Sequence, residues 1–446
     1  MSLGDPPHVP DARASRPIHA QTRLQWVSLA AAALLSVLIL VIQLPGIVRY
    51  HTPDLHPYSR AAAAILHGTD LYANAPGTLK FTYPPFAALA FLPLRLFSFH
   101  AAGAIVTGIS LVALFVVVLV SLAMASADHA SSAGGSSRVS GWAPAVAVFV
   151  FAAALLLEPV QGTLHYGQVN LVLLALVLVD LWRPQGRLPR GVLIGLAAAV
   201  KLTPGIFIVY FLLTRRVKEA LVASATFVIA ALFALAFTPH ASRLYWTSLI
   251  FKLNRVGVVR DARNQSLYGA LARLQGSAHH AHGLWFVAAL AAACLGLGVA
   301  ALLSRRGHEL WGVCACGITG VLISPISWDH HWVWAVPCLV ALGLSAWRSR
   351  SWALAVATIA WWTVFFLAPF WWVMPEPLLW RQSHTLVVVA MSTTLATAHR
   401  LSLVSVLANS YVLAGIVLLG GLSVWMAVVR ASPPSRADPS PPHGPT

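Results

Sequence analysis

Charged residues are scarce in this chain of 446 residues. Lys, Arg, Asp and Glu together make up 9% of it, and only 13 residues are acidic. A soluble domain of this length needs far more charge to cover its surface, so that class is excluded. Hydrophobic residues make up 58% of the chain, and the mean hydropathy is +0.76. These values predict a polytopic membrane protein.

Cysteine is also rare. The chain has 4 cysteines, and each lies within an apolar run, at positions 294, 314, 316 and 338. This placement indicates small hydrophobic side chains rather than a disulfide framework. The polar segment 1–22 leads into a long apolar run that has no small-residue cleavage site. We therefore expect a retained span there rather than a signal peptide.

Long apolar runs recur along most of the sequence. A helix needs about 20 residues to cross a bilayer, and these runs are too long and continuous for barrel strands. We predict an all-α fold of about 12 transmembrane helices in a single domain over residues 23–430. The polar ends, 1–22 and 431–446, are expected to be disordered and cytoplasmic. The expected spans are 24–46, 100–125, 143–157, 168–182, two short helices within 191–214, 217–238, 284–304, 309–326, 331–347, 352–372 and 407–429.

The Lys and Arg clusters set the expected topology, because such clusters mark the cytoplasmic ends of spans. They put the first loop, with Asp54, on the outer face. The segment 81–97 is then expected to lie in the outer interface as a helix. Pro204 predicts a helix break near "VKLTPG". The segment 384–400 remains open, as either a further span or a second interfacial helix.

Polar residues gather at the outer ends of the expected spans. They occur in "EPVQGTLHYGQVN", at 158–170, and in "SPISWDHHWVW", at 324–334. Ionisable groups at membrane depth are costly and usually pair or serve a site, so we expect a cavity there. The loop 239–283 holds six Lys or Arg against one Asp. It either binds anionic lipid phosphates or is a solvated basic loop.

Seven ordered motifs carry a resemblance to a known family. They are "DLHPY", "LHGTDLY", "FTYPPFAAL", "YGQVNLVLL", "VKLTPG", "NQSLYGAL" and "SPISWDHHWVW". In this order and spacing they resemble glycosyltransferase family 87, the polyprenol-phosphate-dependent membrane transferases of actinobacteria, which have the GT-C fold. Within that family the chain looks most like the α-1,2-mannosyltransferases of phosphatidylinositol mannoside synthesis.

The resemblance implies an inverting transferase with its active site on the periplasmic face of the plasma membrane. The donor would be polyprenyl-phosphate-mannose and the acceptor a phosphatidylinositol mannoside, in contact with membrane lipids and without nucleic acid. Inversion needs one base, for which Asp54 is the candidate. The alternative for Asp54 is an N-cap of the following helix.

Lys201 and His331 are the candidates for stabilising the leaving phosphate, so we expect no metal or other cofactor. A snorkelling lysine and interfacial packing of the histidines are the alternatives. The other candidate residues would bind donor or acceptor: His330, Tyr58, Tyr83, Glu158, Tyr166, Gln168, Arg255, Arg263, Asn264, Arg273 and Trp328. Glu158 and Gln168 could instead form a buried polar network, and the aromatic residues could anchor the protein at the interface.

Three other functions stay open at this point. A decaprenyl-phosphoarabinose-dependent arabinofuranosyltransferase and a mannosyltransferase that branches lipomannan would share the fold and the outer Asp54. A transporter or flippase belongs to another class, and should place paired ionisable groups or broken helices near the bilayer midplane. The ionisable residues cluster at one face instead, apart from Lys201, which favours the enzyme.

Overall fold

The computed structural model describes residues 17–49, 52–73, 78–133, 143–184, 186–373 and 403–431. This part of the chain is helical throughout, apart from loops and one backbone bridge between Asn264 and Trp328. The predicted all-α class is therefore confirmed. The segment 384–400 and the two chain ends, 1–16 and 432–446, lie outside the described residues.

Five helices are long and apolar enough to cross a membrane. They are α1 (Pro17–Arg49), α4 (Phe99–Ala133), α10 (Val217–Phe237), α13 (Ala278–Arg305) and α19 (Ser410–Ala431). A sixth crossing forms if α5 (Ala143–Leu155) and α6 (Glu158–Tyr166), which meet at a bend of 71°, are one broken span. The described residues thus confirm a multi-helix membrane protein but do not confirm twelve spans.

The remaining helices are shorter than a full crossing. They are α2 (Leu55–His67), α3 (Pro85–Ala90), η1 (Leu92–Leu96), α7 (Asn170–Trp182), α8 (Val192–Val200), η2 (Thr203–Gly205), α9 (Ile206–Leu213), α11 (Pro239–Thr247), η3 (Leu249–Phe251), η4 (Leu253–Arg255), α12 (Leu267–Leu274), α14 (Glu309–Ile323), η5 (Asp329–Trp334), α15 (Ala335–Ser349), α16 (Trp352–Leu367), η6 (Pro369–Val373) and α18 (Leu403–Ala408).

Two local predictions can be compared with these bounds. The segment 81–97 contains only the short helices α3 and η1, neither of which could cross a bilayer. The segment 191–214 breaks where Pro204 predicts it. Helix α8 ends at Val200, and Lys201 takes an extended conformation with φ −147° and ψ 128°. The break leaves Lys201 in an irregular stretch between two short helices.

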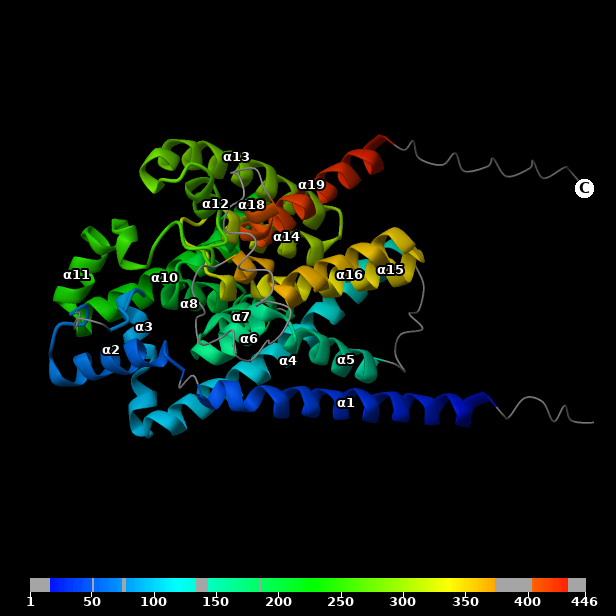
Figure 1. Ribbon diagram of the computed structural model, residues 1–446, viewed down its shortest axis with the longest axis horizontal. Coiled ribbons are helices and arrows are strands. Elements are labelled where there is room, and N and C mark those ends of the chain that lie inside the picture. The colour runs from blue at the N-terminus through cyan, green and yellow to red at the C-terminus, as the bar shows by residue number, and fades with distance from the viewer. Residues whose placement is uncertain are drawn as a thin grey trace, which may run out of the picture.

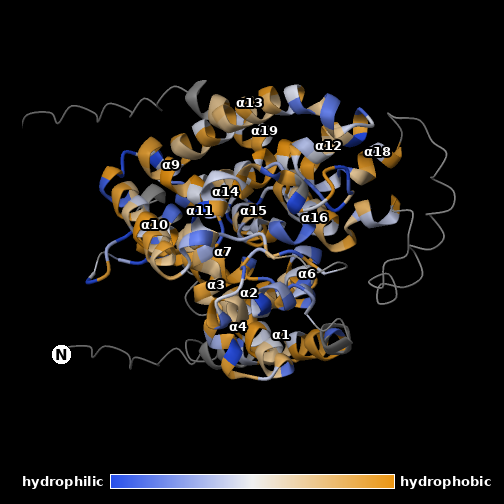
Figure 2. Cartoon of the chain, turned by 90° about the vertical axis from the view of Figure 1, so that its left-hand side faces the viewer, coloured by the Kyte–Doolittle hydropathy of each residue, from blue (hydrophilic) through white to orange (hydrophobic). Residues whose placement is uncertain are grey.

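Figure 1 shows how the helices are arranged. Helix α1 runs along one edge of the molecule, while α2, α3 and α11 gather at one end, away from the outer ends of α15 and α19. Apolar side chains on the long helices face outward; Leu34 and Val417 are 70% and 72% exposed. Figure 2 shows the same hydrophobic surface on α10 and α13. Such surfaces are stable only against lipid, which agrees with a membrane location.

The buried side chains form two main clusters. The larger one joins α4, α7, α14 and α15, and it contains the fully buried Trp332 and Phe365. The second joins α2, α3 and α11 around Tyr58, Tyr72 and Tyr83. The polar residues discussed below lie where these two clusters meet.

Candidate active site

Asp54 begins the site, at the N-terminus of α2. Its backbone N–H donates to the carbonyl of Tyr166 at 3.0 Å, which ties the first loop to the end of α6. Asp54 is the N-cap residue of α2, but its side chain makes no capping hydrogen bond. The alternative interpretation of Asp54 as a capping side chain therefore has no support in the structure. The carboxylate is left for another partner.

That partner is Gln168. Its Nε2 donates to Asp54 Oδ2 at 2.5 Å. Its Oε1 accepts hydrogen bonds from the hydroxyls of Tyr58, at 2.9 Å, and Tyr83, at 2.7 Å. Residues from three of the sequence motifs thus form one connected polar network.

Gly167 makes this arrangement possible. It ends α6 in the left-handed region, with φ +70°, where glycine is favoured. A Cβ at this position would lie 2.7 Å from Cβ of Thr52, so no larger residue fits beside the first loop. The reversal of the chain at Gly167 brings Gln168 next to Asp54.

Electrostatics at Asp54 suit a base. Burial raises the pKa of the Asp54 carboxyl above its ordinary value. The charges of His330 and Lys201 and the hydrogen bond from Gln168 act in the opposite direction and favour the ionised form. A carboxylate with a raised pKa accepts a proton more readily than a solvated one, as general base catalysis requires.

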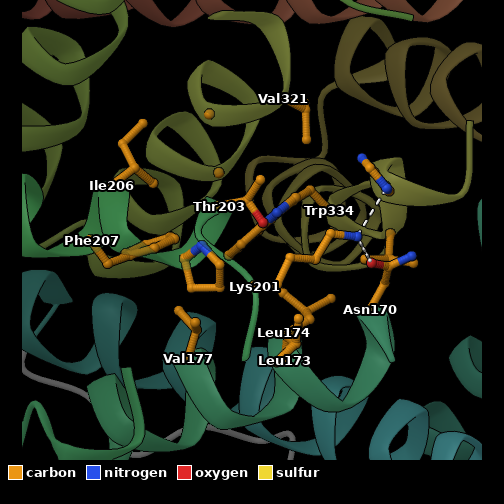
Figure 3. Close-up of a pocket in the computed structure, with 15 residues that line it drawn as sticks. Asn170, Leu173, Leu174, Val177, Lys201, Thr203, Ile206, Phe207, Val321 and Trp334 are labelled. Carbon is orange, nitrogen blue, oxygen red and sulfur yellow. Dashed lines mark hydrogen bonds between the residues drawn. The ribbon is translucent and has the colours of Figure 1, made fainter. Parts of the chain in front are cut away.

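Lys201 lies beside this network. Its Nζ donates to Asn170 Oδ1 at 2.8 Å and lies 2.9 Å from His331 Nε2 (Figure 3). When Lys201 is an ammonium group, which has no acceptor, His331 Nε2 accepts this hydrogen bond and Nδ1 carries the ring proton. The Nζ atom is also 5.5 Å from the centre of the Tyr83 ring. The predicted pair of Lys201 and His331 is therefore in direct contact.

A cavity of about 50 Å³ opens at Lys201. Lys201, His331 and Asn170 form its polar end, and apolar side chains from α7, α9 and α14 line the rest (Figure 3). Leu173, Val177 and Phe207 are among them. The site thus joins a cation to an apolar channel. Asn170 was quoted in a polar motif but was not predicted as a site residue.

His330 lies on the other side of the same segment. Its Nδ1 is 3.1 Å from Asp329 Oδ1, and its ring centre is 5.3 Å from that of Tyr166. Its backbone carbonyl accepts hydrogen bonds from Asn170 Nδ2, at 3.0 Å, and Thr163 Oγ1, at 3.2 Å. The histidine segment is therefore fastened to α6 and α7.

The basic loop is largely engaged within the protein. Arg263 forms an ion pair with Asp261 at 2.5 Å and lies over the ring of Trp328 at 5.6 Å. Arg255 donates to the carbonyl of Phe81 at 3.1 Å and lies 5.1 Å from the centre of the Tyr72 ring. Their prediction as phosphate ligands stays a prediction.

Asn264 and Arg273 hold the loop together. The Asn264 carboxamide donates to the carbonyl of Val259 at 2.9 Å and accepts from the backbone N–H of Ser327 at 2.9 Å. Arg273 donates to the carbonyl of Asn264 at 3.0 Å and to Asn409 Oδ1 at 2.6 Å. These contacts favour a structural role for both residues over substrate binding.

Glu158 lies within the protein rather than at the cavity. Its side chain is buried, and it accepts hydrogen bonds from Tyr411, at 2.9 Å, and Trp371, at 3.5 Å. This supports the alternative of a buried network over contact with sugar hydroxyls. Tyr411 and Trp371 were not predicted, because nothing in the sequence links them to a residue more than 200 positions away.

Comparison with known proteins decides the family. The model of glycosyltransferase family 87 matches residues 81–325, more than half of the chain. The chain belongs to this family. The resemblance of the seven motifs is thereby confirmed, and the chain is a glycosyltransferase.

Three similar family members are curated mannosyltransferases. The first, from Mycobacterium tuberculosis, is a polyprenol-phosphate-mannose-dependent α-(1-2)-phosphatidylinositol mannoside mannosyltransferase. It is 34% identical over 70% of this chain and 75% of its own length. A protein of the same name from Mycolicibacterium smegmatis is 34% identical over 78% and 83%. A pentamannoside mannosyltransferase from Mycobacterium tuberculosis is 32% identical over 77% and 80%. No solved structure matches the chain.

Not all of this glycosyltransferase's site lies within the matched residues. Tyr83, Gln168 and Lys201 fall inside residues 81–325, whereas Asp54 and His331 lie outside them. The fold joins the two groups through the hydrogen bonds from Gln168 to Asp54 and from Lys201 to His331. The five candidate residues are therefore connected in the fold, although the family match covers only three of them.

Proposed function

We propose that this glycosyltransferase transfers mannose from polyprenyl-phosphate-mannose to a phosphatidylinositol mannoside, with inversion to an α-1,2 linkage. The names of the similar mannosyltransferases support the donor, the acceptor and the linkage. The observation that carries the proposal is the pairing of one candidate base with one buried cation. Asp54 and Lys201 interact electrostatically, and Gln168 and Tyr83 lie between them.

In this proposal Asp54 takes the proton from the acceptor hydroxyl. The acceptor oxygen attacks the anomeric carbon of mannose, and the bond from that carbon to the phosphate oxygen breaks on the opposite face. Gln168 holds the Asp54 carboxylate through Oδ2, while Tyr58 and Tyr83 fix the amide of Gln168. The base is thus oriented by side chains that are themselves fully hydrogen-bonded.

Lys201 suits the donor phosphate. Among the described residues no carboxylate lies within ion-pair distance of its Nζ. A buried ammonium without an anionic partner is costly, and a lipid phosphate would supply the missing charge. The apolar cavity beside Lys201 suits the first isoprene units of the donor. The cation also makes a divalent metal unnecessary for stabilising the leaving group, and we propose a metal-independent reaction.

We further propose that the site opens at the periplasmic face of the plasma membrane. The distribution of Lys and Arg along the sequence supports this orientation. The exposed apolar surface of the long helices supports a location in the membrane. Helix α11, the first part of the basic loop, lies at the same end as α2 and would then be close to the anionic headgroups of the outer leaflet (Figure 1).

The test is a transfer assay on the purified protein. The donor is either polyprenyl-phosphate-mannose or decaprenyl-phosphoarabinose, and the acceptor is a tetramannosylated phosphatidylinositol. The wild type is compared with Asp54→Asn and with Asp70→Asn. Asp70 is the matched control, because it is an exposed carboxylate in the same loop that bonds only the backbone N–H of Tyr72. A chelator is added in a parallel series.

Transfer of mannose with chelator present, its loss in Asp54→Asn and its retention in Asp70→Asn are the expected results. Transfer of arabinose instead of mannose would refute polyprenyl-phosphate-mannose as the donor. Full activity of Asp54→Asn would refute the role of Asp54 as the base. Movement of lipid across the bilayer of vesicles, without any sugar transfer, would refute the proposed mannosyltransferase activity.

A further inference from the structure

A pair of buried carboxyl groups lies behind the histidine segment. Glu158, the first residue of α6, and Asp329, the first residue of η5, are 2% and 1% exposed. The two carboxyl groups interact electrostatically, and Asp329 Oδ2 is buried without a partner in the hydrogen bonds of the described residues. Among the described residues neither forms an ion pair with a lysine or arginine. Two adjacent carboxylates in such a site cannot both be ionised, so the pair shares one proton and carries one negative charge.

Hydrogen-bond donors converge on this pair from three elements. Tyr411 of α19 donates to Glu158 Oε2 at 2.9 Å, and Trp371 of η6 donates to Glu158 Oε1 at 3.5 Å. His330 Nδ1 faces Asp329 Oδ1 at 3.1 Å. Because the pair carries one negative charge, His330 Nδ1 must be the donor in this contact. The tautomer and the ring orientation of His330 are thereby fixed.

The opposite ring nitrogen of His330 is then free for the reaction site. Nε2 is buried and has no hydrogen-bond partner among the described residues. The imidazole is close enough to Asp54 to interact with its charge. The backbone carbonyl of His330 is held by Asn170 and Thr163, and its ring contacts Asp329 and Tyr166.

We propose that Asp329 and Glu158 act together as positioning residues for the transfer reaction. Their single shared charge holds His330 with Nε2 directed at the reacting groups beside Asp54. Neither carboxyl contacts substrate, and both act through His330. This inference rests on the proposed function for its assay, but its failure is distinguishable from failure of that function.

The experiment measures kcat and KM of the full-length protein for both lipid substrates. Asp329→Asn removes the charge next to His330. Glu158→Gln keeps a hydrogen-bond donor to Asp329 and leaves one negative charge in the pair. We expect Asp329→Asn to lower kcat by about tenfold or more, since a hydrogen bond to a charged group contributes on that order. Glu158→Gln should lower kcat less than Asp329→Asn does, because the charge next to His330 remains. The KM values of both variants should stay within about threefold of wild type.

A double-mutant cycle separates positioning from a merely structural role. In a His330→Gln background, adding Asp329→Asn should cause no further loss of kcat if Asp329 acts through His330. A double variant whose loss equals the product of the two single losses would overturn the proposal. Equal losses of kcat in Asp329→Asn and Glu158→Gln would overturn the inference that the two carboxyl groups share one negative charge.

Folding is checked by thermal denaturation in detergent. If Asp329→Asn does not fold, the variant Glu158→Asp with Asp329→Glu exchanges the lengths of the two side chains and keeps the pair. Activity of this variant is expected, and its inactivity in folded form would refute the inference. A wild type that transfers no mannose would instead refute the proposed function. An active wild type with an equally active, folded Asp329→Asn variant would refute this inference alone.

Discussion

The hydrogen bond from Gln168 to Asp54 makes the pH dependence of the reaction predictable. Burial raises the pKa of Asp54, and the Gln168 bond lowers it by favouring the ionised carboxylate. The substitution Gln168→Ala removes that bond and leaves the burial in place. The pKa of Asp54 must then rise further, and the ionised base will be lost at a higher pH than in the wild type.

The size of the shift follows from the strength of the bond. A hydrogen bond to a charged group contributes about 1.5–3 kcal/mol, and one pKa unit corresponds to about 1.4 kcal/mol. Removing the single bond at 2.5 Å should therefore move the acidic limb of the pH profile upward by about one to two units. Above this limb the base is ionised in both proteins, so their rates should approach each other.

The assay is kcat/KM for mannose transfer as a function of pH, which reports the ionisation of the free enzyme. Gln275→Ala is the control, because it removes the same chemical group at the C-terminal end of α12, away from Asp54. Its profile should match the wild type. An acidic limb that stays in place in Gln168→Ala would refute the assignment of Asp54 as the base or of Gln168 as its partner.

Three further predictions follow from the site. Lys201→Met should raise the KM for the donor lipid by about tenfold or more, because a charge-assisted contact to phosphate is lost. Lys201→Arg keeps the charge and should raise this KM less. Equal KM values in the two variants would contradict a role of Lys201 in binding phosphate. Gly167→Ala should lower the free energy of unfolding by about 1–3 kcal/mol, because the added Cβ meets Thr52 and the φ of this residue is +70°. The measurement is denaturation in detergent. The control is Gly186→Ala, whose added Cβ meets no atom within 4 Å. Incubation with a chelator followed by its removal should leave kcat unchanged, and a loss restored by one divalent metal would show that a metal takes part.

Local features of the candidate site were easier to predict from the sequence than the number of spans. Asp54, Lys201 and His331 could be singled out because an ionisable group in an apolar chain is costly and must have a reason. The helix break at Lys201 followed from the charge topology of 191–214 and from Pro204. These inferences depend on local chemistry, which a sequence displays directly.

The number of spans could not be predicted in the same way. Helices such as α7, with 13 residues, and α14, with 15, are apolar throughout but shorter than a crossing. Hydropathy records how apolar a segment is, and it does not record where the helix ends or bends. The apolar run ends at residue 157, where the structure has the bend of 71° between α5 and α6, but the hydropathy pattern does not show whether the chain continues as a second helix there.

The partners of buried polar groups were equally hidden. Arg273 bonds to Asn409, which is 136 positions away, and Glu158 bonds to Tyr411, which is 253 positions away. Each residue type was compatible with substrate binding when considered alone. Only the fold shows that their hydrogen-bonding capacity is used within the protein, which changes the role that the geometry favours.

The site draws its residues from widely separated parts of the chain: Asp54, Tyr83, Gln168, Lys201 and His331. During synthesis the ribosome adds Asp54, the candidate base, long before it adds His331, the partner of Lys201. A chain that stops before η5 contains Asp54 and Lys201 but leaves the ammonium group without His331. If Lys201 and His331 act together as proposed, we expect activity only after the late helices have been inserted beside the early ones.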